Sequence, residues 1–214
     1  MYLANYTRPD ISFSVNLLSR YSFSPTQRHW NEVKHVLRYL QGTMNMGLFY
    51  PKIPKLELIG YADAGYLSDP HHGRSQTGYL FTSGDTTISW RSVKQTITAT
   101  SSNHAELLAL HEASRECVWL RSMIQHIQKN CGLSSGRMDA TIIYEGDRTK
   151  HISPKFFFTH DLQKNGDINI QQIQSCDNLA DVFTKSLPSK VFEKLVLRIC
   201  LRRLRDICFH EGEK

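Results

Sequence analysis

The chain has 214 residues, of which 40% are hydrophobic and 21% are charged, and its formal net charge is +6. This length and composition predict one globular domain with a modest extension, and they exclude a membrane-spanning helix because no uninterrupted apolar run exceeds four residues. The N-terminus lacks a secretory pattern and the five cysteines form no C-x-x-C pair, so an intracellular protein of the cytoplasm or the nucleus is expected.

Two helices are predicted at the start of the chain, over about residues 10–20 and 26–41, because apolar residues recur there every three or four positions. Pro9 and Pro25 each stand where a helix can begin but not continue, which marks two separate helices. Gly42 is expected to end the second helix.

From residue 56 the hydrophobic period changes to that of β-strands, and a long amphipathic helix follows. The predicted strands cover residues 56–62, 77–82, 86–90, 141–144 and 168–173. The predicted helices cover residues 103–128, about 154–163 and the region from Asn178 to the C-terminus. This order predicts an α/β fold with a mixed sheet of about five strands flanked by helices.

Three acidic side chains fall at the edges of otherwise apolar elements. Asp63 ends the first predicted strand among small residues, where an aspartate also commonly forms a turn. Glu106 shares a face with the apolar stripe of the long helix, where a charge needs a partner, but Asn103 and Glu106 also have the spacing of a capping box. Asp181 lies in the first turn of a predicted helix, where the helix dipole alone favours an acid. Gathered at one edge of a sheet, these carboxylates would offer the hard oxygen ligands that Mg²⁺ prefers.

Six motifs follow one another along the chain. They are Gly60–Ala64, Arg74–Tyr79, Ile88–Gln95, Ser101–Glu106, Arg148–Ile152 and Asn178–Lys185. In this order they resemble the ribonuclease H domain of Ty1/copia-type retrotransposon Pol polyproteins, and the stretches Thr7–Ile11 and His35–Thr43 resemble the end of the reverse transcriptase that precedes it. The resemblance implies a helical reverse transcriptase tail over residues 1–50, a ribonuclease H-like domain over 56–200 and a basic tail over 201–214.

The resemblance also implies a chemistry, the hydrolysis of RNA in an RNA–DNA hybrid by two Mg²⁺ ions, with Mn²⁺ as an alternative. Asp63, Glu106 and Asp181 match the first, second and fourth acidic residues of the family, which are its catalytic metal ligands. The residues expected to bind nucleic acid are Arg74, Lys94, Arg148, Lys150 and His151, although the run from Arg148 to His151 also suits a solvated basic turn. The implied partners are a hybrid or other nucleic acid and the remainder of a Pol polyprotein, with no membrane.

The third acidic ligand of the family is missing. The family has a Tyr-Glu-Asp-Asn motif at the end of the fourth strand, whereas this chain reads Tyr144-Glu145-Gly146-Asp147 and passes straight to the segment expected after the next helix. That helix is therefore expected to be deleted. Asp147 belongs to the later segment, and Glu145 faces away by strand alternation, so both are doubtful substitutes for the missing ligand.

Loss of one ligand from a two-metal site predicts feeble hydrolysis or none. The sequence therefore leaves two hypotheses open. One is a ribonuclease H domain with impaired activity. The other is a catalytically inactive nucleic-acid-binding module or a remnant fragment of a Pol polyprotein.

Overall fold

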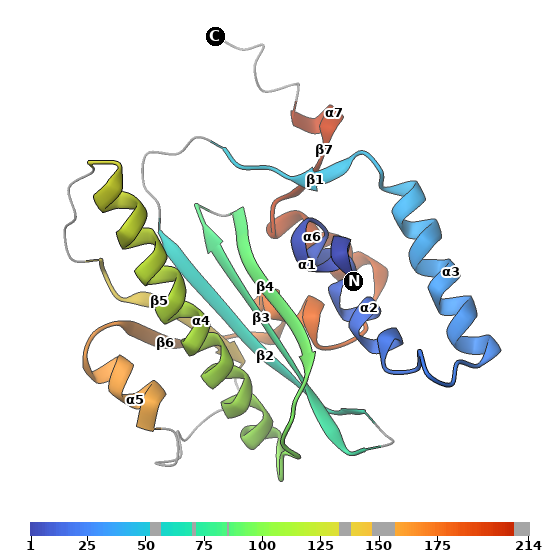
Figure 1. Ribbon diagram of the computed structural model, residues 1–214, viewed down its shortest axis with the longest axis horizontal. Coiled ribbons are helices and arrows are strands. Elements are labelled where there is room, and N and C mark those ends of the chain that lie inside the picture. Colours follow the sequence, from blue (N-terminus) through green and yellow to red (C-terminus); the bar gives the residue numbers. More distant parts are fainter. Residues whose placement is uncertain (52–56, 70–71, 85, 133–137, 147–156, 208–214) are drawn as a thin grey trace.

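The computed structural model describes residues 1–51, 57–69, 72–84, 86–132, 138–146 and 157–207 of the chain (Figure 1). Five strands form its main sheet: β2 (Leu58–Asp69), β3 (Arg74–Ser83), β4 (Thr86–Lys94), β5 (Thr141–Gly146) and β6 (Ile168–Ile173). The strand order is β4-β3-β2-β5-β6, with β2, β3 and β4 antiparallel and β5 and β6 parallel to β2. This mixed five-stranded sheet confirms the predicted fold class.

Helices lie against both faces of this sheet. The α-helices are α1 (Tyr2–Tyr6), α2 (Ser12–Ser19), α3 (Gln27–Gly42), α4 (Ser102–Asn130), α5 (Phe157–Lys164), α6 (Ser189–Arg198) and α7 (Leu204–Ile207). Three short 3₁₀ helices are η1 (Pro9–Ile11), η2 (Ser175–Asp177) and η3 (Leu179–Phe183). The two N-terminal helices, the long central helix and all five strands predicted from the sequence are present, with shifted ends.

The long helix α4 crosses one face of the sheet (Figure 1). Its apolar stripe, which includes Leu110 and Cys117, packs against Phe81 on β3 and Ile143 on β5, and all four side chains are buried. Burial of this stripe is the main reason that a 29-residue segment forms a helix here, because packing of an apolar face supplies most helical stability.

The opposite face of the sheet is covered by the C-terminal helices together with the N-terminal segment. Leu80 on β3 lies in a second buried cluster with Phe183 of η3 and Leu195 of α6. The N-terminal helices contact this region, since the Trp90 indole N–H on β4 donates a hydrogen bond of 2.8 Å to the carbonyl oxygen of Ala4. The N-terminal segment is therefore docked on the sheet.

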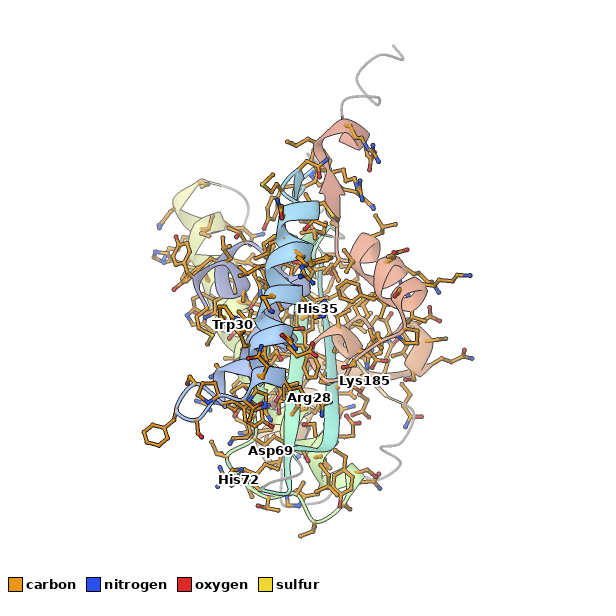
Figure 2. All side chains as sticks on the ribbon, turned by 90° about the vertical axis from the view of Figure 1, so that its right-hand side faces the viewer. Arg28, Trp30, His35, Asp69, His72 and Lys185 are labelled. Atoms are coloured by element: carbon orange, nitrogen blue, oxygen red, sulfur yellow. The ribbon has the colours of Figure 1, made fainter. Side chains whose placement is uncertain are left out.

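Helix α3 packs much more loosely than α2. None of its residues is buried, and the Trp30 side chain is 54% exposed (Figure 2). An apolar groove of about 810 Å³, lined by Leu18 and Trp30 among others, lies between α2 and α3. None of the acidic residues named by the sequence lines this groove.

The predicted helical region from Asn178 to the C-terminus is partly wrong. Helix α6 ends at Arg198, and Cys200 has a φ of 64°, a left-handed conformation that an α-helix cannot propagate. The chain then forms strand β7 (Leu201–Arg203), which pairs antiparallel with strand β1 (Met46–Leu48). A three-residue strand carries too little periodicity to be recognised in a sequence.

Between β5 and β6 the described residues contain one helix, α5, close to the predicted helix at 154–163. The predicted deletion of a helix rests on residues 147–156, which lie outside the described residues. The division into regions 1–50, 56–200 and 201–214 stays a prediction. Across the described part of the chain, no helix has the length and apolar character needed to cross a bilayer.

Candidate functional site

Asp63 lies within strand β2 and is only 5% exposed. Its placement at a strand end is wrong, because antiparallel pairing of β2 with β3 continues to Asp69, well past the residues of β2 that pair with β5. The Asp63 Oδ2 atom accepts a hydrogen bond from the Thr184 hydroxyl and lies 3.7 Å from the Lys185 Nζ atom. Asp63 therefore is a buried, partnered carboxylate and not a turn former.

Asp181 is held on the short helix η3 and is also 5% exposed. Asn178 caps this helix: its side-chain oxygen accepts from the Ala180 N–H at 3.0 Å, and its amide donates to the Ala62 carbonyl at 2.9 Å. Because Ala62 precedes Asp63, this fully buried asparagine ties the start of η3 to the strand that carries Asp63. The cap therefore brings the two carboxylates together.

Two glycines allow η3 to lie directly on the sheet. A Cβ atom on Gly78 would lie 2.6 Å from the Thr184 methyl carbon, 2.7 Å from the Phe183 Cβ and 3.0 Å from the Ala180 carbonyl oxygen. A Cβ atom on Gly65 would overlap the Thr184 carbonyl oxygen. The absence of side chains on β2 and β3 at these positions thus permits the contact between Asp63 and the segment that carries Asp181.

Glu106 reaches the same centre from α4. Of the two alternatives for Glu106, the capping box with Asn103 is wrong, because the helix is capped by Ser101, whose hydroxyl accepts from the His104 N–H at 3.1 Å. Glu106 instead lies close to the Ala64 backbone N–H on β2. Burial raises the Glu106 pKa well above its usual value, and the negative charge of Asp63 raises it further, while the Ala64 N–H lowers it.

Glu145 is the fourth buried carboxylate. It alternates with Thr141 and Ile143 on the face of β5 that packs against α4, and it is 4% exposed. Its Oε2 atom has no hydrogen-bond partner among the described residues, and burial raises the Glu145 pKa to about 7. Its charge also raises the pKa of Glu106, which places the two carboxylates within electrostatic reach. The register of β5 with β2 nevertheless places Glu145 on the face of the sheet opposite to Asp63, as strand alternation predicted. Below, the carboxylate centre means Asp63, Glu106 and Asp181.

Sequence reasoning missed the cation at this centre. The Lys185 Nζ atom lies 2.8 Å from Asp181 Oδ1 and 3.7 Å from Asp63 Oδ2. Burial and the charge of Asp63 raise the pKa of Asp181, while Lys185 opposes this effect. Lys185 ends the motif Asn178–Lys185 and stands four residues after Asp181, a spacing typical of ion pairs on one helical face. That spacing is the signal that could have identified it.

Mg²⁺ is the ion that the family resemblance implies. The donor chemistry fits it, because carboxylate oxygens are hard ligands and Glu145 Oε2 is buried without a partner among the described residues. The geometry does not fit it: in the described part of the chain no three His, Cys, Asp or Glu side chains converge closely enough to hold a metal ion. As arranged, the centre holds the Lys185 ammonium group instead.

Replacing Glu145 with glutamine is expected to change how stability depends on pH. Because the Glu145 pKa rises from 4.5 to about 7 on folding, the folded protein binds this proton more tightly than the unfolded chain does. This contribution to the wild-type stability is therefore complete below pH 4.5 and is lost as the pH rises toward 7, by about 3 kcal/mol. Glu145→Gln should match the wild type at pH 4.5 and exceed its free energy of unfolding by that amount at pH 8. Urea unfolding at both pH values measures this, and an unchanged difference between the two proteins would contradict it.

The predicted nucleic-acid-binding residues Arg74 and Lys94 lie at the hairpin end of the sheet, beyond Asp63 along β2. Asp69 organises this end: Lys94 Nζ lies 3.4 Å from its Oδ2 atom, and Arg74 pairs with it in the strand register. His72 lies beside Asp69 (Figure 2), with its Nδ1 atom 3.2 Å from Asp69 Oδ2. Arg20 Nη1 lies 3.9 Å from the same oxygen. One buried carboxylate thus faces several basic groups, which leaves this end of the sheet with an excess of positive charge.

The other predicted site residues lie outside the described residues. They are Asp147, Arg148, Lys150 and His151. Their proposed roles stay predictions.

A mixed five-stranded sheet with buried carboxylates contributed by its central strand and by elements on both faces defines a ribonuclease H-like α/β domain. No family model matches the chain. The chain is 33% identical over 97% of its length to the retrovirus-related Pol polyprotein from transposon RE2 of Arabidopsis thaliana and 34% identical over 90% to that from transposon TNT 1-94 of Nicotiana tabacum. The chain belongs to the Ty1/copia-type retrotransposon Pol polyproteins, and it spans 15% of the length of each of these two relatives.

Two further similarities are more restricted. Over 120 residues, 56% of this chain and 84% of the relative, the chain is 44% identical to the secreted RxLR effector protein 161 of Plasmopara viticola. The N-terminal RNase H domain of rv2228c from Mycobacterium tuberculosis, solved as a fusion with maltose-binding protein, is 14% identical. That comparison has a TM-score of 0.42 and covers 66% of this chain and 97% of the solved one.

Proposed function

We propose that this chain is a ribonuclease H-type domain that binds RNA–DNA hybrids and hydrolyses the RNA strand weakly. The observation that carries the proposal is the meeting of Asp63 and Asp181 at one point, where each lies within 4.0 Å of the Lys185 ammonium group. Glu106, which matches the second acidic residue of the family, is electrostatically coupled to Asp63. Membership of the Pol polyproteins supports a nucleic-acid substrate.

Weak activity follows from what the centre lacks. The residue after Glu145 is Gly146, where the family motif has an aspartate, so one oxygen ligand is absent. Because the centre has fewer hard oxygen ligands and a lysine ammonium group lies between its carboxylates, it should bind Mg²⁺ or Mn²⁺ poorly. Hydrolysis should therefore be slow.

Substrate binding is assigned to the basic hairpin end of the sheet. Arg74 and Lys94 lie there, and the net charge of +6 favours a polyanionic partner. Binding through phosphates releases counterions, so hybrid affinity should fall steeply between 50 and 200 mM salt. Arg148, Lys150 and His151 are proposed to add contacts on the basis of sequence alone.

The test is cleavage of a hybrid whose RNA strand carries a 5′ label, with Mg²⁺ or Mn²⁺ present. We expect slow, metal-dependent cleavage by the wild type and none by Asp63→Asn, which has nearly the same size and no charge. Asp177→Asn is the matched control, because Asp177 lies on η2 with its carboxylate paired to Arg198 at 2.9 Å. Wild-type cleavage that does not exceed that of Asp63→Asn would refute the hydrolytic part of the proposal.

A second candidate function, hybrid binding without turnover, is favoured by the position of Lys185 between Asp63 and Asp181. Fluorescence anisotropy at two salt concentrations separates the candidates. Salt-dependent hybrid binding together with absent cleavage would select this one, and absent binding would exclude both.

A further inference from the structure

Lys185 lies two residues beyond the end of η3, after Thr184, and its side chain reaches back into the carboxylate centre. Its ammonium group is 2.8 Å from Asp181 Oδ1 and 3.7 Å from Asp63 Oδ2, and the side chain is 41% exposed (Figure 2). The Asp63 and Asp181 side chains themselves are nearly inaccessible, at 7% exposure each. Lys185 is therefore the part of this arrangement that faces solvent.

The carboxylate centre needs a cation. Asp63 lies within electrostatic reach of both Glu106 and Asp181, and the three come from three different elements. Buried carboxylates repel each other strongly in a medium of low dielectric constant. The Thr184 hydroxyl provides Asp63 with a hydrogen bond but no charge. Among the described residues, Lys185 is the basic side chain that forms ion pairs with members of this centre.

We infer that the Lys185 ammonium group is a built-in, displaceable cation of the carboxylate centre, and that a divalent metal ion can bind Asp63 and Asp181 only when this group moves out to solvent. The inference rests on the proposed function in that it concerns the same carboxylates. It adds a competitor for the metal within the chain itself.

Displacement is physically reasonable for this side chain. A lysine ammonium is a compact charge on a flexible four-carbon stem, and it does not bind carboxylates in the fixed two-pronged manner of arginine. Because 41% of the side chain is already exposed, it can turn away without unfolding η3. The Asn178 cap and the packing of Phe183 would keep Asp181 in place after Lys185 has left.

The test measures Mn²⁺ binding to the full chain by electron paramagnetic resonance, in the absence of nucleic acid. We expect Lys185→Met and Lys185→Gln to bind Mn²⁺ about tenfold more tightly than the wild type, since a positive charge close to two ligands has been removed, with allowance for its partial exposure. Lys185→Arg, which keeps the charge, should bind as weakly as the wild type. Lys190→Met, which removes an exposed lysine of α6, is the control for net charge.

Each other outcome is decisive. The inference would be overturned if Lys185→Met and Lys185→Gln bound Mn²⁺ no more tightly than the wild type. It would also be overturned if Lys185→Arg bound Mn²⁺ as tightly as the neutral variants are expected to, or if Lys190→Met showed the same increase in Mn²⁺ affinity. Adding Asp181→Asn to Lys185→Met should remove the gain, and its persistence would place the ion elsewhere. If either neutral variant unfolds without metal, Mn²⁺ should restore its thermal transition and leave that of the wild type nearly unchanged. A confirmed gain in Mn²⁺ affinity without hybrid cleavage in any variant would count against the proposed function alone.

Discussion

Replacing Gly146 with aspartate is expected to raise the rate of metal-dependent cleavage of the hybrid RNA by at least about 100-fold. Even the loss of a group that only hydrogen-bonds to a metal ligand lowers metal affinity or activity by about 10–100-fold, and a direct ligand should matter more. Gly146 ends β5, where the family motif has its third acidic residue. Tyr144 pairs with Tyr61 in the parallel register. Two residues further along each strand, Gly146 and Asp63 therefore lie on the same face of the sheet.

There is space for this side chain. A Cβ atom on Gly146 would meet no described atom within 4 Å, and this glycine does not have a positive φ. Single-turnover cleavage measures the gain. Gly146→Asn is the matched control, because it adds the same bulk without a charged oxygen pair. Equal rates for the two variants would mean that a missing ligand is not what limits this protein.

Replacing Gly78 with alanine is expected to lower the free energy of unfolding by about 3 kcal/mol, the upper part of the range for overpacked positions. The added Cβ would overlap atoms of η3, and one of them is the Ala180 carbonyl oxygen, which belongs to the backbone and cannot rotate away. The helix must therefore move off the sheet. Asp181 would move with it, so hybrid cleavage should be lost even at temperatures where the variant stays folded.

Urea unfolding with Gly47→Ala as the control measures this effect. Gly47 also lies in a strand, but an added Cβ there meets nothing within 4 Å. We expect a change of less than about 0.5 kcal/mol for the control. Similar stabilities of the two variants would show that η3 does not rely on close contact with β3.

The sequence predicted most of the architecture because strong local patterns encode it. The apolar stripe of α4 runs from Leu107 to Ile127 along a helix of 29 residues, and the strands of the main sheet are rich in β-branched and aromatic residues. The ends were less well predicted. The end of β2 depends on its pairing with β3, and the end of α6 on the left-handed conformation of Cys200, and both are tertiary features.

The candidate site, too, could be predicted from the sequence only in part. Asp63, Glu106 and Asp181 were found through motifs, and the structure brings all three into electrostatic contact. The burial of Glu145 could not be predicted, because one polar residue at the end of a short apolar strand does not reveal whether a helix covers it. Nor did any pattern indicate that the Lys185 side chain would turn inward. That choice depends on two carboxylates lying close to it in space, one of them far away in sequence.

The pairing of β1 with β7 has a consequence for how the chain folds. Met46 lies opposite Arg203, and the Phe49 N–H donates to the Cys200 carbonyl at 3.1 Å, so a segment before the main sheet and a segment after it close one long loop. Contacts between such distant residues form late, because the entropy of closing the loop must be overcome first. On the ribosome, β1 would emerge and wait without its partner until almost all of the sheet had been synthesised. Completion of the β1–β7 pair would then mark the end of folding.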